Sequence, residues 1–137
     1  MMSQTASDTF HIGHVASRVG LSLRTVRHYE TLGLVTPSGR TDGGFRLYTE
    51  PDVQRLLLVR ALKPAELSLD ELHAVLELHD RVVAGDADDE ARARLQRIVD
   101  HTAERLQLQR ERIIAAELAL EQLRRSSGLD PQRRGAA

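Results

Sequence analysis

The sequence contains no cysteine and no tryptophan, and aromatic residues make up only 3% of its 137 residues. Without cysteine the chain has no disulfide scaffold, no thiolate metal site and no thiol nucleophile. So few aromatic side chains are atypical of a β-sandwich or barrel. No apolar run reaches the roughly 18 residues that a membrane-spanning helix needs, and the first residues lack the pattern of a signal peptide. We therefore expect no membrane partner and a cytoplasmic location.

The net charge of −1 conceals an uneven distribution of charge along the chain. Residues 11–63 carry 8 basic and 4 acidic residues, whereas residues 67–90 carry 1 basic and 8 acidic residues. This asymmetry indicates a polyanionic partner for the N-terminal part only. Hydrophobic residues make up 41% of the chain, which suits one small domain with a core followed by an extended element.

Two short helices are predicted near the N-terminus. Apolar residues recur at helical spacing from Ile12 to Val19, and Gly20 ends this first helix. Ser22 can cap the start of a second helix, which Gly33 closes. Two short helices joined by so tight a turn are typical of a helix-turn-helix, whose second helix enters the major groove of DNA.

A small hairpin is predicted after these helices. Residues 35–37 and 46–48 are the candidate strands, and the segment between them is rich in glycine and other turn formers. These glycines lie in a turn and not between a strand and a helix, so they do not form a phosphate-binding loop. Every aromatic residue of the chain lies within residues 10–48, where it can either pack the hairpin or touch DNA.

Two more helices and an acidic segment are predicted next. The third helix begins at a cap on Thr49 and runs to about Lys63. The fourth follows a capping box at residues 68–71 and is expected to bury Leu69 among other apolar residues. Residues 84–90 (AGDADDE) are small and acidic, which predicts a linker or turn.

One long helix is predicted from residue 91 to 124, because no glycine or proline interrupts this segment. Its apolar positions recur in steps of four and three, which is the seam of a coiled coil about four heptads long. A helix of about 51 Å cannot bury its seam on so small a domain, so we expect a second copy of the chain to cover it. An intramolecular fold-back onto the third and fourth helices is the alternative. The seam consists of Leu95, Val99, Thr102, Leu106, Gln109, Ile113, Ala116, Leu120 and Leu123.

Basic residues on the second helix and the hairpin have the chemistry of DNA contacts. Arg24 and Arg27 lie three residues apart on one helical face, and each can bind guanine or a phosphate through its planar fork. Thr25 can donate to a phosphate or touch a thymine methyl group. Arg40 and Arg46 make the hairpin a basic wing that would hold the flanking DNA backbone.

Residues 11–78 resemble the DNA-binding domain of MerR-family transcription regulators. The motifs are IGHVA at residues 12–16, GLSLRTVRHYE at 20–30, GLV at 33–35 and RTDGGFRLY at 40–48, in the family's order and spacing. The long C-terminal helix stands where the family has its antiparallel dimerisation coiled coil.

The resemblance implies a mainly α fold, with a winged helix-turn-helix DNA-binding domain followed by a long antiparallel dimerisation helix. It implies a homodimer that binds double-stranded DNA at a pseudo-palindromic promoter spacer. The residues themselves offer no phosphate-binding loop and no scaffold like a nucleophile elbow, so we expect no enzyme activity and no cofactor. The activating form of such a regulator bends and untwists the spacer, so that RNA polymerase can engage both promoter elements. The DNA contacts it implies are Arg24, Thr25, Arg27, His28, Tyr29, Arg40, Arg46, Tyr48 and Lys63.

The predicted organisation divides the chain into five segments. They are residues 1–10 (disordered), 11–82 (DNA-binding domain), 83–90 (acidic linker), 91–124 (dimerisation helix) and 125–137 (disordered basic tail). An architectural or excisionase-like DNA-bending protein is the alternative function, and a coiled-coil adaptor is a third. The long helix argues against the former, and the ordered basic motifs argue against the latter.

Two positions depart from the family pattern. His28 stands where tyrosine or phenylalanine is usual, and Glu66 replaces glycine in the turn between the third and fourth helices. The family's metal and redox sensors use cysteine clusters, which are absent here, and His73 with Glu77 is better interpreted as solvated surface than as a metal site. A small-molecule effector and constitutive binding both remain open.

Overall fold

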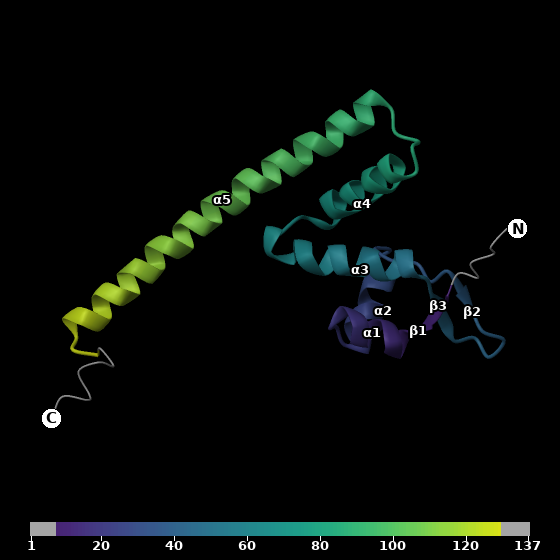
Figure 1. Cartoon of the computed structure of the whole chain (residues 1–137), viewed down its shortest axis with the longest axis horizontal. Coiled ribbons are helices and arrows are strands. Elements are labelled where there is room, and N and C mark those ends of the chain that lie inside the picture. The colour runs from purple at the N-terminus through teal and green to yellow at the C-terminus, as the bar shows by residue number, and fades with distance from the viewer. Residues whose placement is uncertain (1–7, 130–137) are drawn as a thin grey trace, which may run out of the picture. The chain divides into compact units, whose positions relative to one another are not determined.

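The computed structural model describes residues 8–129 of the chain. The chain forms two compact units that divide between Leu95 and Gln96, inside one long helix. The elements are labelled in Figure 1. They are β1 (Phe10–His11), α1 (Ile12–Val19), α2 (Leu23–Thr31), β2 (Gly39–Arg40), β3 (Arg46–Tyr48), α3 (Glu50–Leu62), a 3₁₀ turn η1 (Lys63–Ala65), α4 (Leu69–Val83) and α5 (Asp89–Ser126).

The helix-turn-helix formed by α1 and α2 confirms the prediction from the sequence. Gly20 has a φ of +66°, a left-handed conformation that glycine adopts without steric cost, and it ends α1. The Ser22 hydroxyl accepts a hydrogen bond from the Thr25 N–H at 3.1 Å, which caps α2. Local signals of this kind were sufficient to place both helices.

The sheet has three antiparallel strands in the order β1-β3-β2, with Phe10 opposite Tyr48 and Arg40 opposite Arg46. The first predicted strand was misplaced, because β2 is Gly39–Arg40 and not residues 35–37. The Thr41 N–H donates to the Phe45 carbonyl at 2.8 Å and closes a tight turn. The residues next to this turn, Arg40 and Arg46, therefore pair with each other. β1 was not predicted at all, and its Phe10 belongs to the segment expected to be disordered.

The core of the first unit joins the helix-turn-helix to the sheet and to α3. Its fully buried side chains come from α1, α2, β3 and α3 and from Val35 in the loop after α2. α1 packs against β1, β3 and α3. A second cluster of Leu34, Val59 and Leu76 joins α3 and α4, and Tyr29 of α2 contacts both clusters. α2 is therefore packed against both clusters.

The capping predictions for α3 and α4 are confirmed. The Thr49 N–H donates to the Asp52 carboxylate at 2.8 Å, and the Ser68 N–H donates to the Glu71 carboxylate at 2.8 Å. Leu69 is 43% exposed, which contradicts its predicted burial, because it occupies the first position of α4 beside the cap.

The turn between α3 and α4 contains an unusual backbone conformation. Glu66 has a φ of +51° and follows η1, and it is the one non-glycine residue with positive φ within residues 8–129. The turn therefore keeps the left-handed conformation for which glycine is best suited, although the sequence supplies glutamate.

Replacing Glu66 by glycine is expected to stabilise the fold relative to replacing it by alanine. Both changes remove the carboxylate, but only glycine also removes the Cβ, which is the atom that makes the left-handed conformation costly. The free energy of unfolding should be higher for Glu66→Gly than for Glu66→Ala by about 0.5–1 kcal/mol, after allowing for the more flexible unfolded chain. Urea denaturation followed by circular dichroism measures the difference. Equal stabilities would mean that the turn relaxes to another conformation.

The long helix α5 extends two residues beyond each end of the predicted range 91–124. Its seam leaves Val99, Leu106, Ile113, Ala116, Leu120 and Leu123 exposed, while Leu95 is half-buried and Thr102 is buried. Residues 1–7 and 130–137, which include most of the segments expected to be disordered, lie outside the described residues. No helix in the described part of the chain is long and apolar enough to cross a membrane.

Candidate nucleic-acid interface

One face of α2 exposes the arginines that the sequence assigned to DNA. Arg24, Arg27 and His28 are exposed, Thr25 is half-buried, and Val26 on the opposite face has no exposed surface. Neither arginine makes an ion pair within residues 8–129. Both guanidinium groups are therefore available to an external anion.

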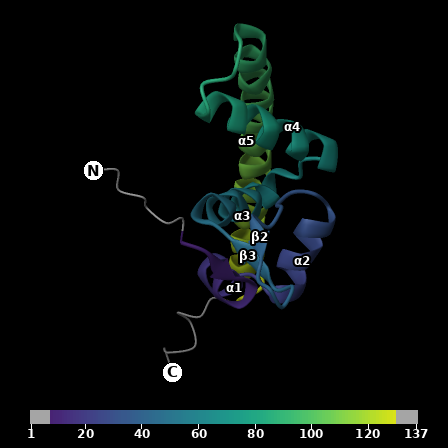
Figure 2. The same cartoon turned by 90° about the vertical axis from the view of Figure 1, so that its right-hand side faces the viewer.

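The Glu30 carboxylate of α2 accepts hydrogen bonds from two side chains of the wing. The Arg46 Nε donates to Glu30 at 2.9 Å, and the Tyr48 hydroxyl donates to its other oxygen at 3.1 Å. Figure 2 shows the strands of the wing beside α2. The hydrogen bond from Arg46 to Glu30 also raises the pKa of Arg46. These hydrogen bonds therefore connect the wing directly to α2.

The predicted DNA contacts outside α2 differ in their surroundings; they are Arg40, Arg46, Tyr48 and Lys63. Arg40 is exposed, and its guanidinium donates to the Gly44 carbonyl at 3.3 Å. The Arg46 side chain is 34% exposed, and only its Nε is engaged by Glu30, which leaves both terminal nitrogens without a protein partner in the described part. Lys63 is exposed at the start of η1. All three cations are at least partly exposed to solvent, whereas Tyr48 is not.

Tyr48 is entirely buried, which contradicts the expectation that it contacts DNA. Burial is the largest cause of its shifted ionisation, and the nearby Glu30 carboxylate adds to it, so that the pKa of the Tyr48 hydroxyl rises to about 12. Tyr29 is half-buried between the two core clusters. Both tyrosines thus pack the domain, and the Tyr48 hydroxyl contacts Glu30 of α2.

The raised pKa of Tyr48 is expected to appear in a spectroscopic titration. In a Tyr29→Phe variant Tyr48 is the one remaining tyrosine, and its phenolate absorbance should rise with a midpoint near pH 12. Because the folded protein favours the protonated Tyr48 hydroxyl, this hydroxyl stabilises the fold fully at pH values below its unfolded pKa of about 10. The stabilisation should be lost as the pH rises from about 10 towards 12. The control is the same titration in denaturant, with a midpoint of about 10. A midpoint near 10 in the folded protein would contradict the burial of this hydroxyl.

A second ion pair links α1 to the start of α3. Arg18 donates to both oxygens of Glu50, at 2.5 and 2.8 Å, and its guanidinium lies 5.4 Å from the centre of the Phe10 ring. Hydrogen bonds from Arg18 and then Gln54 lower the pKa of Glu50 to about 2. This contact fastens β1 and α1 to α3 away from the exposed face of α2. Neither it nor the role of Glu30 could be predicted, because the partners lie 16 or more residues apart.

The histidines of α4 do not form a metal cluster. Within residues 8–129 no group of three or more histidines and carboxylates could hold a metal ion. The His73 Nε2 is instead hydrogen-bonded to the Leu32 carbonyl at 2.9 Å.

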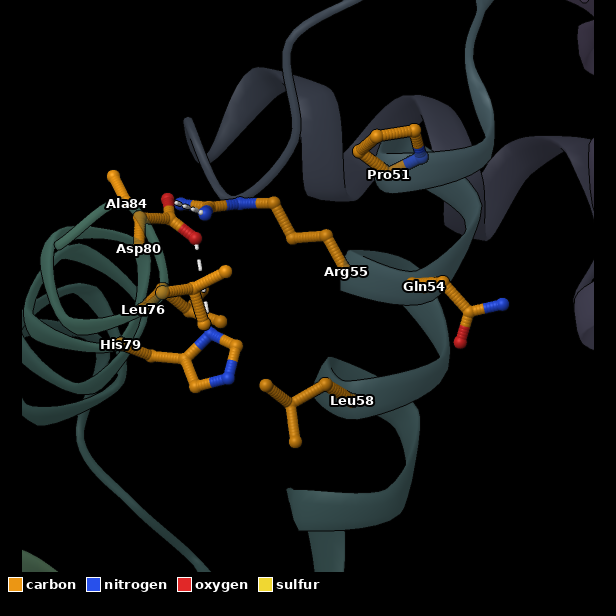
Figure 3. A pocket seen from close by; sticks show the side chains of 9 residues that line it. Pro51, Gln54, Arg55, Leu58, Leu76, His79, Asp80 and Ala84 are labelled. Carbon is orange, nitrogen blue, oxygen red and sulfur yellow. Dashed lines mark hydrogen bonds and ion pairs between the residues drawn. The ribbon is translucent and has the colours of Figure 1, made fainter.

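A cavity of about 340 Å³ lies between α3 and α4. Leu58 and Leu76 form its apolar wall, and Arg55 crosses it from α3 to reach Asp80 on α4 (Figure 3). The Arg55–Asp80 ion pair, at 2.5 Å, thus joins two residues that line the cavity.

Comparison with known families matches residues 10–78 to the family described as MerR HTH family regulatory protein. The nodulation protein NolA of Bradyrhizobium elkanii is 43% identical over 68 residues, which cover 50% of this chain and 31% of that protein. The mercuric resistance operon regulatory protein of Bacillus cereus is 34% identical over 85 residues, which cover 62% of this chain and 59% of that protein. The chain thus spans between 31% and 59% of the length of these curated relatives.

The fold is similar to that of a solved regulator over most of the chain. The transcription regulator PbrR691 from Ralstonia metallidurans, crystallised in complex with lead(II), superposes with a TM-score of 0.58 at 32% identity. The match covers 85% of this chain and 87% of that one. It therefore extends well beyond the residues that match the family.

Proposed function

Because the chain belongs to the MerR family of HTH regulatory proteins, we propose that it is a transcription regulator that binds double-stranded promoter DNA as a homodimer. Membership of this family places the chain among regulatory proteins and not among enzymes. The observation that carries the proposal is the exposed pair Arg24 and Arg27, which no acidic residue neutralises within the described residues. Both lie on a helix whose opposite face is buried in the core. By analogy with helix-turn-helix proteins in general, we infer that α2 enters the major groove.

In this proposal α2 reads bases and the surrounding cations fix the DNA backbone. Arg24 and Arg27 contact guanine edges or phosphates, and Thr25 and His28 contact the neighbouring positions. The wing adds the backbone contacts, with Arg40 and the free terminal nitrogens of Arg46 facing phosphates. Lys63, beyond α3, and the exposed edge of Tyr29 complete the interface.

The exposed apolar stripe of α5 supports the proposed homodimer. Five large side chains along its seam have between 38% and 59% of their surface exposed, namely Val99, Leu106, Ile113, Leu120 and Leu123. A helix that presents so regular a stripe to water is typical of one strand of a coiled coil. A second copy with antiparallel α5 would cover the stripe, and its two-fold axis matches a pseudo-palindromic operator.

The proposed mechanism is deformation of the promoter. Two recognition helices held at a fixed separation by paired α5 helices would bend and untwist an overlong spacer, so that RNA polymerase could engage both promoter elements. Specificity would then depend on the deformability of the spacer as well as on base contacts. The protein would act in the cytoplasm, bound to the nucleoid.

Selection of DNA from fragmented host genome by the purified protein tests the proposal. Recovered fragments should share an inverted repeat inside long promoter spacers, and the repeat should bind with a log–log salt slope of about −7 or steeper, as expected for about eight or more phosphate contacts. Broad enrichment without dyad symmetry would favour an architectural DNA-bending protein. Absence of salt-dependent DNA binding would overturn both functions.

A further inference from the structure

The C-terminal end of the recognition helix is held by side chains from two other helices. α2 ends at Thr31 and is followed by the cap residue Leu32 and by Gly33, whose φ is +73°. The Leu34 N–H donates back to the Tyr29 carbonyl at 3.0 Å. This turn leaves the carbonyls of Leu32 and Leu34 on either side of Gly33 free to accept other donors.

The first donor is His73 on α4. Its Nε2 lies 2.9 Å from the Leu32 carbonyl oxygen, which requires the nitrogen to carry the proton. The same ring packs on Gly33, since a Cβ at that position would lie 3.4 Å from the His73 Cε1. α4 therefore touches the last turn of the recognition helix directly, both by hydrogen bond and by ring contact.

The second donor is Arg55 on α3. Its Nε donates to the Leu34 carbonyl at 2.5 Å, and its Nη1 is paired with Asp80 on α4 at 2.5 Å. Figure 3 shows this side chain reaching from α3 to Asp80. α4 thus has a second, indirect connection to the backbone that leads from α2 into the wing.

We propose that His73 and the Asp80–Arg55 pair are positioning residues that set the orientation of α2 with respect to α4. This inference rests on the proposed function, in which two copies bind one operator. α4 is the helix that precedes α5, the proposed dimerisation helix, in the chain. In a dimer, the separation and angle between the two copies of α2 depend on how each α2 is oriented with respect to α4 and α5 of its own chain. These contacts therefore select the spacing of the operator half-sites, not the bases within each half-site.

The test compares His73→Leu with His73→Gln on a series of operators. The probes are duplexes of the selected inverted repeat with central spacers of native length and one or two base pairs shorter or longer, and an isolated half-site. Glutamine places an amide nitrogen close to the position of the imidazole Nε2 and keeps the hydrogen bond to Leu32, whereas leucine removes it. Wild type and His73→Gln should prefer the native spacer, and His73→Leu should lose about tenfold of that preference. Half-site affinity should be unchanged in all three.

Asp80→Asn provides a second test that does not depend on the folding of the histidine variants. Asp80 is exposed, so its substitution leaves the core intact, yet it removes the charge that holds Arg55. Its matched control is Glu77→Gln, which removes an equal charge from an exposed position of α4 that makes no ion pair within residues 8–129. The preference for the native spacer should weaken in Asp80→Asn, as in His73→Leu, and stay unchanged in Glu77→Gln.

Two results would overturn the inference. In the first, His73→Leu and Asp80→Asn keep the wild-type dependence of affinity on spacer length. In the second, both variants bind all spacers and the half-site more weakly by the same factor, and that factor matches the loss of folded protein. Either would reduce these residues to a structural role. Failure of the wild-type protein to bind any inverted repeat would instead count against the proposed function.

Discussion

Replacing Ile113 by aspartate is expected to convert the proposed dimer into monomers and to abolish tight binding to the operator. Ile113 lies at the middle of the α5 seam and is 59% exposed in the single chain. A second helix would bury this position, and an unpaired carboxylate there costs several kcal/mol in each copy. The dissociation constant of the dimer should rise by a factor of about 1,000 or more, because each 1.4 kcal/mol changes it tenfold. Sedimentation equilibrium measures this constant.

Leu118 is the matched control for Ile113. It is 67% exposed on the same helix, but five residues further on it lies roughly 140° around the helix axis. Leu118→Asp therefore adds the same charge away from the seam and should leave the dimer intact. If Ile113→Asp still sediments as a dimer, or if both variants dissociate equally, the seam has been assigned to the wrong face.

Replacing Arg27 by alanine is expected to weaken operator binding by about 1–3 kcal/mol while leaving the fold and the dimer unchanged. Arg27 is exposed and makes no ion pair within residues 8–129, so its loss breaks no contact that holds the domain together. Fluorescence anisotropy with a labelled operator, repeated over a range of salt concentrations, measures the effect.

Arg27→Lys distinguishes the two kinds of contact that Arg27 can make. Lysine keeps the charge but lacks the planar fork, so a guanine contact should be lost in both variants, whereas a phosphate contact should be largely retained in the lysine variant. A guanine contact also relaxes specificity at one base pair, and a phosphate contact lowers the salt slope by about 1. Wild-type affinity in Arg27→Ala would remove this residue from the interface.

The helices could be predicted from the sequence because their signals are local. Gly20 and Ser22 mark the ends of α1 and α2, and the capping box at residues 68–71 marks the start of α4. A heptad pattern that runs over many turns likewise specifies α5. Each of these signals lies within a few residues of the structure that it determines, so tertiary contacts did not need to be known.

The sheet and the contacts of the site could not be predicted in the same way. β1 is two residues long, and its residues pair with partners 36 and 38 positions away. So short a segment carries no alternating pattern. Tyr48 resembles an exposed wing aromatic in the sequence, and only the pairing of β3 between two strands shows that it points into the core. The role of His73 depends on Leu32, 41 residues earlier. Such contacts depend on the folded chain as a whole.

The attachment of the wing to Glu30 has a consequence for the thermodynamics of association. Both oxygens of this carboxylate are engaged, by Arg46 and by Tyr48, before any DNA is present. An arginine that moves freely loses rotamer entropy when it is immobilised on a phosphate, and that loss reduces affinity. Arg46 has already lost most of this freedom during folding, so its contribution to binding is expected to carry a smaller entropic penalty than that of Arg24 or Arg27. Preorganisation of the wing thus favours affinity without adding a contact.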